Sequence, residues 1–240
     1  MVLWGTIVNA LAIVCGAMMG SRLSRISDGI RSTVMQGIGL AICILGITMA
    51  LKTQNFLILL FSLVAGGIIG ELIRVEYWLD RLGQMIESRV GGKGSNIATG
   101  FVTATLVYCV GAMAILGSMD SGLRHNHDIL YTKSMLDGFS AVIFASTLGI
   151  GVLFSAVPVL LYQGFIAIAS TFISSFISEA MLNAMITEIT AVGGILILGI
   201  GMNILEIRKI NVGNLLPSIL IAAITVWMTQ HGFAIIKAWF

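Results

Sequence analysis

Long apolar segments follow one another along almost the whole chain, and this pattern restricts the fold more than any other feature. A helix needs about 20 mostly apolar residues to cross the hydrocarbon core of a bilayer. Eight segments meet this requirement, and they are Val2–Met19, Val34–Leu51, Phe56–Val75, Ile97–Ser118, Ser134–Ala156, Val157–Ile177, Ile186–Ile207 and Asn214–Gln230.

The scarcity of charged residues gives the same indication. They make up 10% of the 240 residues, whereas a soluble domain usually carries about 25%. So few charges cannot cover a water-exposed surface, and we expect lipid to take its place. The net charge of +2 gives no reason to expect a nucleic-acid partner. We therefore predict an all-α, polytopic transmembrane bundle of about eight spans, built as one domain over residues 1–240 in a lipid bilayer.

Two connections between the spans are longer than simple turns. Residues 20–33 and 76–90 place apolar side chains on one helical face and charged ones on the other. Such segments either lie on the membrane surface or pack against the ends of the bundle. In contrast, the fifth and sixth spans meet at Pro158 with almost no loop, which predicts a tight turn there.

The distribution of Lys and Arg predicts the orientation of the chain, because cytoplasmic loops carry the excess of positive charge. With eight spans, nine of these residues fall on one side and four on the other. The nine-residue side is expected to be cytoplasmic, which puts both termini on the outer side of the membrane. If one of the eight segments is re-entrant, the C-terminus lies on the cytoplasmic side instead. The larger set is Arg22, Arg25, Arg31, Arg74, Arg81, Arg89, Lys93, Arg208 and Lys209.

An internal repeat is suggested by a pattern shared between the second and seventh spans. Residues 42–49 and 195–202 both read Ile-x-Ile-Leu-Gly-Ile-x-Met. Successive spans cross the membrane in alternating directions, so the second and seventh spans run in opposite directions. If they match, spans 1–3 and 6–8 would form an inverted repeat, as in many secondary transporters. Chance is the alternative, because apolar helices use few residue types. Small residues four apart, as at Gly16 and Gly20, also favour close helix packing and a homo-oligomer.

Ionisable residues inside apolar segments are the main candidates for a functional site, because a charge in a spanning helix is costly. Lys133 and Asp137 are four residues apart, so a helix places them on one face. A Lys–Asp pair enters the membrane at lower cost than either residue alone. The alternative is a pair at the water interface that caps the helix.

Further polar residues complete the predicted substrate- or ion-binding set. Asp120 ends the fourth span and would reach the same membrane face as Lys133. Glu188 opens the seventh span, where it could equally complement the helix dipole. The amides of Asn9, Gln163 and Asn203 lie within spans, where they either bridge helices or line a polar path.

No cofactor or metal site is predicted with comparable support. His125, His127 and Asp128 share a short loop and could bind a transition metal, but no further ligand spacing accompanies them, so the metal question stays open. Cys15, Cys43 and Cys109 each lie in an apolar run and have no metal-ligand spacing.

Six stretches of the chain carry a resemblance, and they are 5–10, 108–118, 133–138, 145–152, 163–164 and 199–203. They are similar to a bacterial membrane family of unknown function, the YdfK/YqgA-like family. This resemblance implies a bacterial inner-membrane protein with at most a role in transport, and it brings no substrate or mechanism. The matching residues include Asn9, Asp137, Gln163 and Asn203.

We therefore expect a transporter or channel for a small solute or ion, with movement linked to a cation or a proton. An intramembrane enzyme that uses Asp120 and Asp137 is an alternative, but Gly-Ser-Met precedes Asp120 and the Gly-x-Gly-Asp signature of intramembrane aspartyl proteases is absent. Zinc-protease and serine-hydrolase motifs are absent as well, so we expect no enzymatic activity. A membrane scaffold that docks partners through residues 76–90 is the third hypothesis.

Overall fold

The computed structural model describes the chain except for residues 23–27, 79–80, 82–84, 86–96 and 240. Its described part is helical and contains no strand, so the predicted all-α, polytopic bundle is confirmed. The helices are α1 (Trp4–Arg22), α2 (Asp28–Ala50), α3 (Phe56–Ile73), α5 (Ile97–Cys109), α6 (Ala112–Leu123), α7 (Asp128–Leu148), α8 (Gly151–Phe154), α9 (Ala156–Phe176), α10 (Glu179–Ile204), the 3₁₀ helix η1 (Val212–Leu215) and α11 (Pro217–Trp239).

Six of the described helices are long and apolar enough to cross a membrane, and the bent pair α5–α6 brings the number to seven. The fifth predicted span corresponds to α7, which is not in this set. Its outward side chains are nevertheless apolar, because Met135 and Phe139 are 78% and 71% exposed. Its polar residues Lys133 and Asp137 are buried instead. A helix with this arrangement suits lipid rather than water, and we infer that α7 is the eighth span.

One predicted boundary is wrong, and one predicted span is broken. The fifth and sixth spans are separated at Gly149 and α8, not at Pro158, which lies in the first turn of α9. Proline fits there because the first amides of a helix have no partner within the helix. The fourth span is broken between α5 and α6 with a bend of 59°. Gly111 takes φ 149° at this break, a conformation that side-chain-bearing residues rarely adopt.

The predicted amphipathic connections fall mostly outside the described residues. Of the first, residues 20–22 belong to the end of α1 and residues 28–33 to the start of α2, and the rest is not described. Of the second, residues 76–78, 81 and 85 are helical, and the others lie outside the described part.

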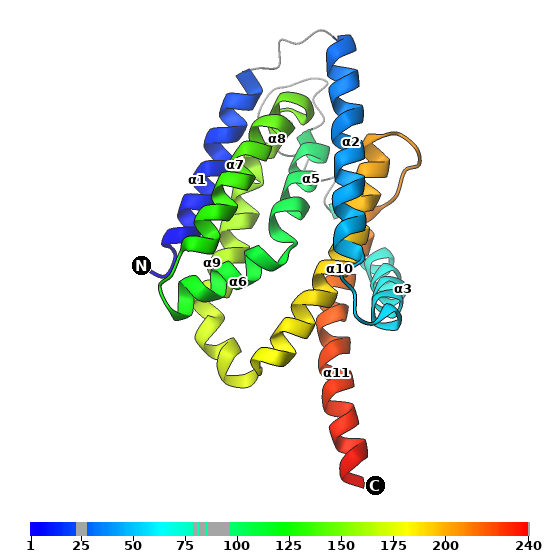
Figure 1. The fold of residues 1–240 in the computed structure, drawn as a ribbon. Helices are drawn as coiled ribbons and strands as arrows, with labels where there is room; N and C mark the ends of the chain where they lie inside the picture. Colours follow the sequence, from blue (N-terminus) through cyan, green and yellow to red (C-terminus); the bar gives the residue numbers. More distant parts are fainter. Residues whose placement is uncertain (23–27, 79–80, 82–84, 86–96, 240) are drawn as a thin grey trace.

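The helices form two groups that lie side by side (Figure 1). The first helix group contains α1, α5, α6, α7, α8 and α9, and α1 packs closely along α7. The second helix group contains α2, α3, α10 and α11, with α2 packed along α10 and α3 along α11. The groups meet mainly where α10 lies against α5 and α6. At this seam a Cβ on Gly193 of α10 would overlap the Val110 side chain.

The predicted inverted repeat stays a prediction. It requires opposite directions for α2 and α10, and these helices do run antiparallel, because Gly39 faces Gly201 and Gly46 faces Gly194. In contrast, α1 and α7 are parallel, since Gly16 faces Gly138 and Gly20 faces Val142.

Both termini lie at the lower ends of their helices in Figure 1, as an even number of spans requires.

The contact between α1 and α7 depends on the absence of side chains. A Cβ on Gly16 would overlap the carbonyl oxygen of Gly138, and the methyl group of Ala12 lies 3.2 Å from the Cβ position of Gly138. Small residues allow this approach of two backbones, and dispersion contacts between the helices then stabilise the pair.

We predict that Gly16→Ala lowers the free energy of unfolding by about 1–3 kcal/mol, the usual cost of overpacking. Gly37→Ala is the matched control, because no atom lies within 4 Å of its Cβ position. The control should unfold like the wild type or slightly later, since Ala is the better helix former. SDS-induced unfolding in mixed micelles measures both variants. Equal stability of the two variants would contradict the close α1–α7 contact.

Candidate functional site

Four buried polar side chains from three helices meet inside the first helix group. Asn9 comes from α1, Lys133 and Asp137 come from α7, and Gln163 comes from α9. Each is at most 7% exposed, although the surrounding helices are apolar. We call these four residues the Asp137 cluster.

An ion pair forms the centre of the Asp137 cluster. The Lys133 Nζ atom lies 2.9 Å from Oδ1 and 2.8 Å from Oδ2 of Asp137. The Asn9 Nδ2 atom donates to Asp137 Oδ2 over 3.0 Å and to the Gln163 Oε1 atom over 3.3 Å. The carboxylate therefore accepts from two donors, and the two amides connect α7 to α1 and α9.

The local sequence explains why these groups meet. The spacing of four residues places Lys133 and Asp137 on the same face of α7. Gly138 follows directly and allows the α1 backbone to approach α7 closely. Asn9 lies one helical turn before Ile13 on the buried face of α1, so the close approach brings its amide within reach of the carboxylate.

Each ion of the Lys133–Asp137 pair stabilises the other one in its buried position. Removing two ions from water is costly, and their attraction offsets this cost only when both partners are present and hydrogen-bonded. If Lys133 were absent, the Asp137 carboxylate would stay buried with only the Asn9 amide as its donor among the described contacts. The amide bonds of the cluster add to the stability of the ionised form.

The cluster also has hydrogen-bonding capacity that the protein does not use. The Oδ1 atom of Asn9, the Nε2 atom of Gln163 and the Oγ1 atom of Thr6 are buried and have no hydrogen-bond partner in the described structure. An unsatisfied buried polar group costs about 1–3 kcal/mol. The Gln163 nitrogen therefore remains available as a donor, the Asn9 oxygen as an acceptor and the Thr6 hydroxyl as either, for a water molecule or a polar solute.

Two residues of this region were missed by the sequence analysis. Thr6 lies three residues before Asn9 on the same buried face of α1, and this spacing was the available signal. Tyr108 of α5 is fully buried, and its hydroxyl oxygen lies 3.4 Å from the Ser140 hydroxyl oxygen. The Ser140 hydroxyl donates to the backbone carbonyl oxygen of Asp137 over 3.0 Å. No sequence pattern connects Tyr108 to α7, because the two are far apart in the chain.

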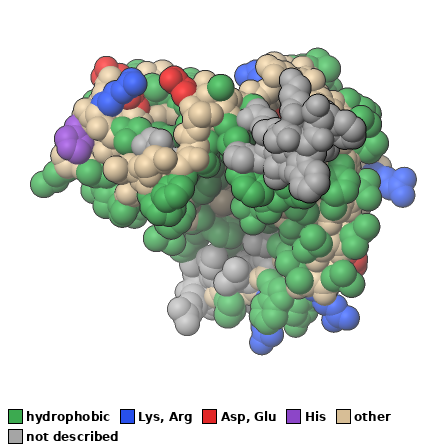
Figure 2. Space-filling view, turned by 90° about the horizontal axis from the view of Figure 1, so that it is seen from below, with side chains coloured by type: hydrophobic (Ala, Val, Ile, Leu, Met, Phe, Trp, Pro, Cys, Tyr) green, Lys and Arg blue, Asp and Glu red, His purple; other side chains and the backbone are tan. Residues whose placement is uncertain are grey.

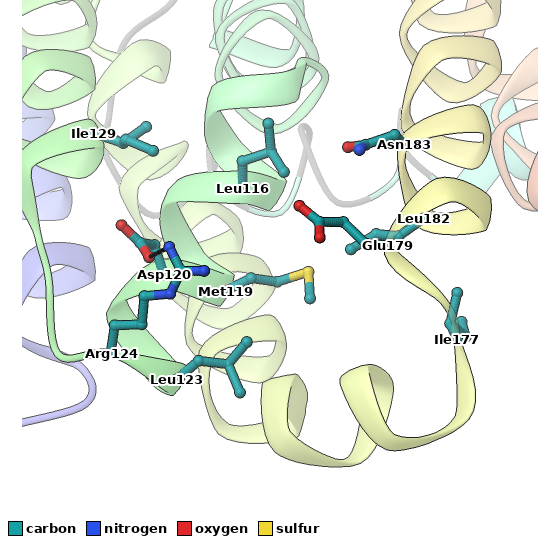
Figure 3. Close-up of a pocket in the computed structure, with 10 residues that line it drawn as sticks. All are labelled: Leu116, Met119, Asp120, Leu123, Arg124, Ile129, Ile177, Glu179, Leu182 and Asn183. Atoms are coloured by element: carbon teal, nitrogen blue, oxygen red, sulfur yellow. Dashed lines mark ion pairs between the residues drawn. The ribbon is translucent and has the colours of Figure 1, made fainter.

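The structure does not bring the other three predicted residues into the cluster. Asp120 of α6 pairs with Arg124 over 3.5 Å and lines a separate cavity (Figure 3). Asn203 near the end of α10 donates to the Ile210 carbonyl over 2.8 Å and accepts from the Ile210 amide over 2.7 Å. Its side chain thereby holds the loop that follows α10.

Glu188 holds the turn between α2 and α3. One carboxylate oxygen accepts from the Thr53 hydroxyl over 2.6 Å. The other accepts from the backbone amides of Gln54 and Asn55 over 2.8 and 3.1 Å. The side chain is almost fully buried, and it satisfies amides that precede α3. This arrangement makes Glu188 a structural anchor within the second helix group.

The histidine loop makes structural contacts. The Ser121 hydroxyl donates to the Val2 carbonyl over 2.7 Å and lies 2.9 Å from the His127 Nδ1 atom. The His125 Nδ1 atom lies 3.4 Å from the Ser121 carbonyl oxygen. Within the described part of the chain, no three His, Cys, Asp or Glu side chains are grouped as a metal site requires.

Comparison with known proteins identifies relatives over nearly the whole length. Residues 4–227 match the family model described as a protein of unknown function, DUF554. The uncharacterized membrane protein YdfK of Bacillus subtilis is 35% identical over 97% of this chain and 99% of its own length. The uncharacterized protein YqgA of Escherichia coli is 30% identical over 91% of this chain and 94% of its own length. No solved structure matches the chain.

We predict that Lys133→Met lowers the free energy of unfolding by about 3–5 kcal/mol, because it leaves the buried carboxylate without its cation. The double variant Lys133→Met/Asp137→Asn should recover most of this loss, since it removes both charges. Unfolding in mixed micelles measures both.

Arg124→Met is the matched control for this comparison. It removes the cation of a pair with the same spacing in which the Arg124 side chain is 79% exposed, so its effect should stay below about 1 kcal/mol. If the double variant is no more stable than Lys133→Met, the charges are not coupled and the described ion pair is wrong.

Proposed function

This chain belongs to the DUF554 family of proteins of unknown function, and on that premise we propose that it is a membrane transporter or channel for a small solute or ion. The observation that supports the proposal is the Asp137 cluster. Ion pairs and amides inside a spanning helix group are costly and typically mark substrate or ion pathways. A purely structural network would use its hydrogen-bonding groups fully, whereas this cluster leaves several of them free.

A cation or a proton is the coupled species that the cluster suits best. Its oxygen atoms belong to the Asp137 carboxylate and to the amides of Asn9 and Gln163, and hard cations prefer such ligands. Lys133 now neutralises the carboxylate at 2.8 Å. An incoming cation competes with the Lys133 ammonium group for the same oxygens, and a proton does so by neutralising the carboxylate. Release of Lys133 then changes the contacts of α7 with α1.

The arrangement of the helices supports a carrier rather than a fixed pore. The two helix groups share a limited seam along α10, with α5 and α6 opposite it. Movement of one group against the other is the usual form of alternating access in transporters built from inverted repeats. The inverted repeat of spans 1–3 and 6–8 belongs to this proposal.

We also propose a location and an orientation. The organisms of the two relatives are bacteria, and the cell inner membrane is the expected site. The excess of Lys and Arg in the sequence segments that connect the spans on the side away from the termini supports a cytoplasmic location for that side and an outside location for both termini. Exposed apolar side chains are compatible with a homo-oligomer.

An enzymatic function is less well supported by the geometry. The two candidate carboxylates are each paired with a different cation, Asp120 with Arg124 and Asp137 with Lys133. An aspartyl pair needs two carboxylates close enough to share one proton, and the described contacts do not join these two. We therefore propose no catalytic role for them.

Flux of Na⁺, K⁺ and H⁺ into proteoliposomes tests the proposal. Asp137→Asn should lower the flux of the coupled cation about tenfold or more, because the cluster loses its ionised ligand. The double variant Lys133→Met/Asp137→Asn should be equally inactive, and its restored stability separates loss of function from misfolding.

Asp120→Asn is the matched control, because it neutralises an aspartate outside the Asp137 cluster. Its flux should stay within about twofold of the wild type, since Asp120 is paired with a solvent-exposed arginine and such pairs contribute little energy. Wild-type flux in both Asp137 variants, across all three cations, would remove Asp137 from the mechanism.

A further inference from the structure

A second polar site lies away from the Asp137 cluster, between the two helix groups. The face of the molecule seen from below is hollowed near its centre (Figure 2). A cavity of about 400 Å³ opens between α6 and the start of α10, a volume within the range of small-molecule sites. Its lining residues are Leu116, Met119, Asp120, Leu123, Arg124, Ile129, Ile177, Glu179, Leu182 and Asn183.

The charges around this cavity leave one negative charge uncompensated. Asp120 is paired with Arg124 over 3.5 Å, so these two residues together are neutral. The Glu179 carboxylate points into the cavity from the first turn of α10 (Figure 3). It forms no ion pair or side-chain hydrogen bond with any part of the chain that the structure describes. The cavity therefore offers one free carboxylate and a net charge of −1.

The walls of the cavity are mostly apolar. Leu116 and Met119 of α6 face Leu182 of α10, and Figure 3 shows their side chains around the same space as the Glu179 carboxylate. A hydrated inorganic cation gains nothing from such walls and would need further oxygen ligands. An apolar wall beside a single carboxylate suits a ligand that carries one positive charge on an apolar body.

We propose that this cavity binds a small organic cation, with its ammonium group on Glu179 and its apolar part against Leu116, Met119 and Leu182. This inference goes beyond the proposed function, because it assigns a ligand class to a site outside the Asp137 cluster and is tested by binding alone. A bound ligand contacts α6 of the first helix group and α10 of the second, so it bridges the seam between them.

Isothermal titration of the protein in nanodiscs tests this site, with empty nanodiscs as the blank. Phenethylammonium is the charged probe, and 2-phenylethanol is its uncharged match in shape. The wild type should bind the ammonium at least about fivefold more tightly than the alcohol, which is the worth of one partly exposed ion pair. Glu179→Gln should abolish this preference.

Two further variants sharpen the assignment. Arg124→Gln releases Asp120 as a second free carboxylate, so binding of phenethylammonium should become about fivefold tighter. Glu206→Gln is the matched control, because Glu206 is an exposed glutamate just beyond the opposite end of α10, and its affinity should equal that of the wild type.

Three results would overturn the proposal. The first is equal binding of the ammonium and the alcohol to the wild type. The second is a preference for the ammonium that survives in Glu179→Gln. The third is competition by Na⁺ at the same concentration as phenethylammonium, which indicates an inorganic cation site. Flux measurements do not enter these outcomes, so failure of the transport proposal stays distinguishable from failure of this one.

Discussion

The packing of α1, α7 and α9 in the first helix group depends on the ion pair between Lys133 and Asp137. Two charges that are buried among apolar helices require each other and require donors and acceptors around them. Asn9 and Gln163 supply these groups from α1 and α9. Such short polar contacts are possible only if the backbones come close, and the glycines between α1 and α7 allow this approach. Packing and polar chemistry therefore depend on the same interface.

The cluster could be predicted because its signal is local. Lys133 and Asp137 are separated by one helical turn, and Asn9 and Gln163 are amides inside apolar segments, where polar side chains need partners. The lipid environment and the helical class follow from composition, because a chain with few charges cannot cover itself in water. These features require no knowledge of which helices are neighbours.

The remaining predicted residues depend on contacts that the sequence does not express. Glu188 binds a turn more than 130 positions away in the chain, and Asn203 binds a loop carbonyl and amide. Backbone groups of distant turns carry no residue-type signal. The boundary at Gly149 was missed for a related reason, because Pro158 is the more conspicuous helix-breaking residue but is tolerated in the first turn of α9.

The break between α5 and α6 has a consequence for what can surround it. The first amides of α6 and the last carbonyls of α5 have no full set of partners along their own helices. Hydrocarbon chains offer no hydrogen bonds, so bare peptide groups at this depth must be shielded by other helices or wetted. Gly193 of α10 lies directly against Val110 at this position and provides part of that shield. Acyl tails are therefore expected to be excluded from this part of the seam, and the second helix group serves there as a cover for an interrupted backbone.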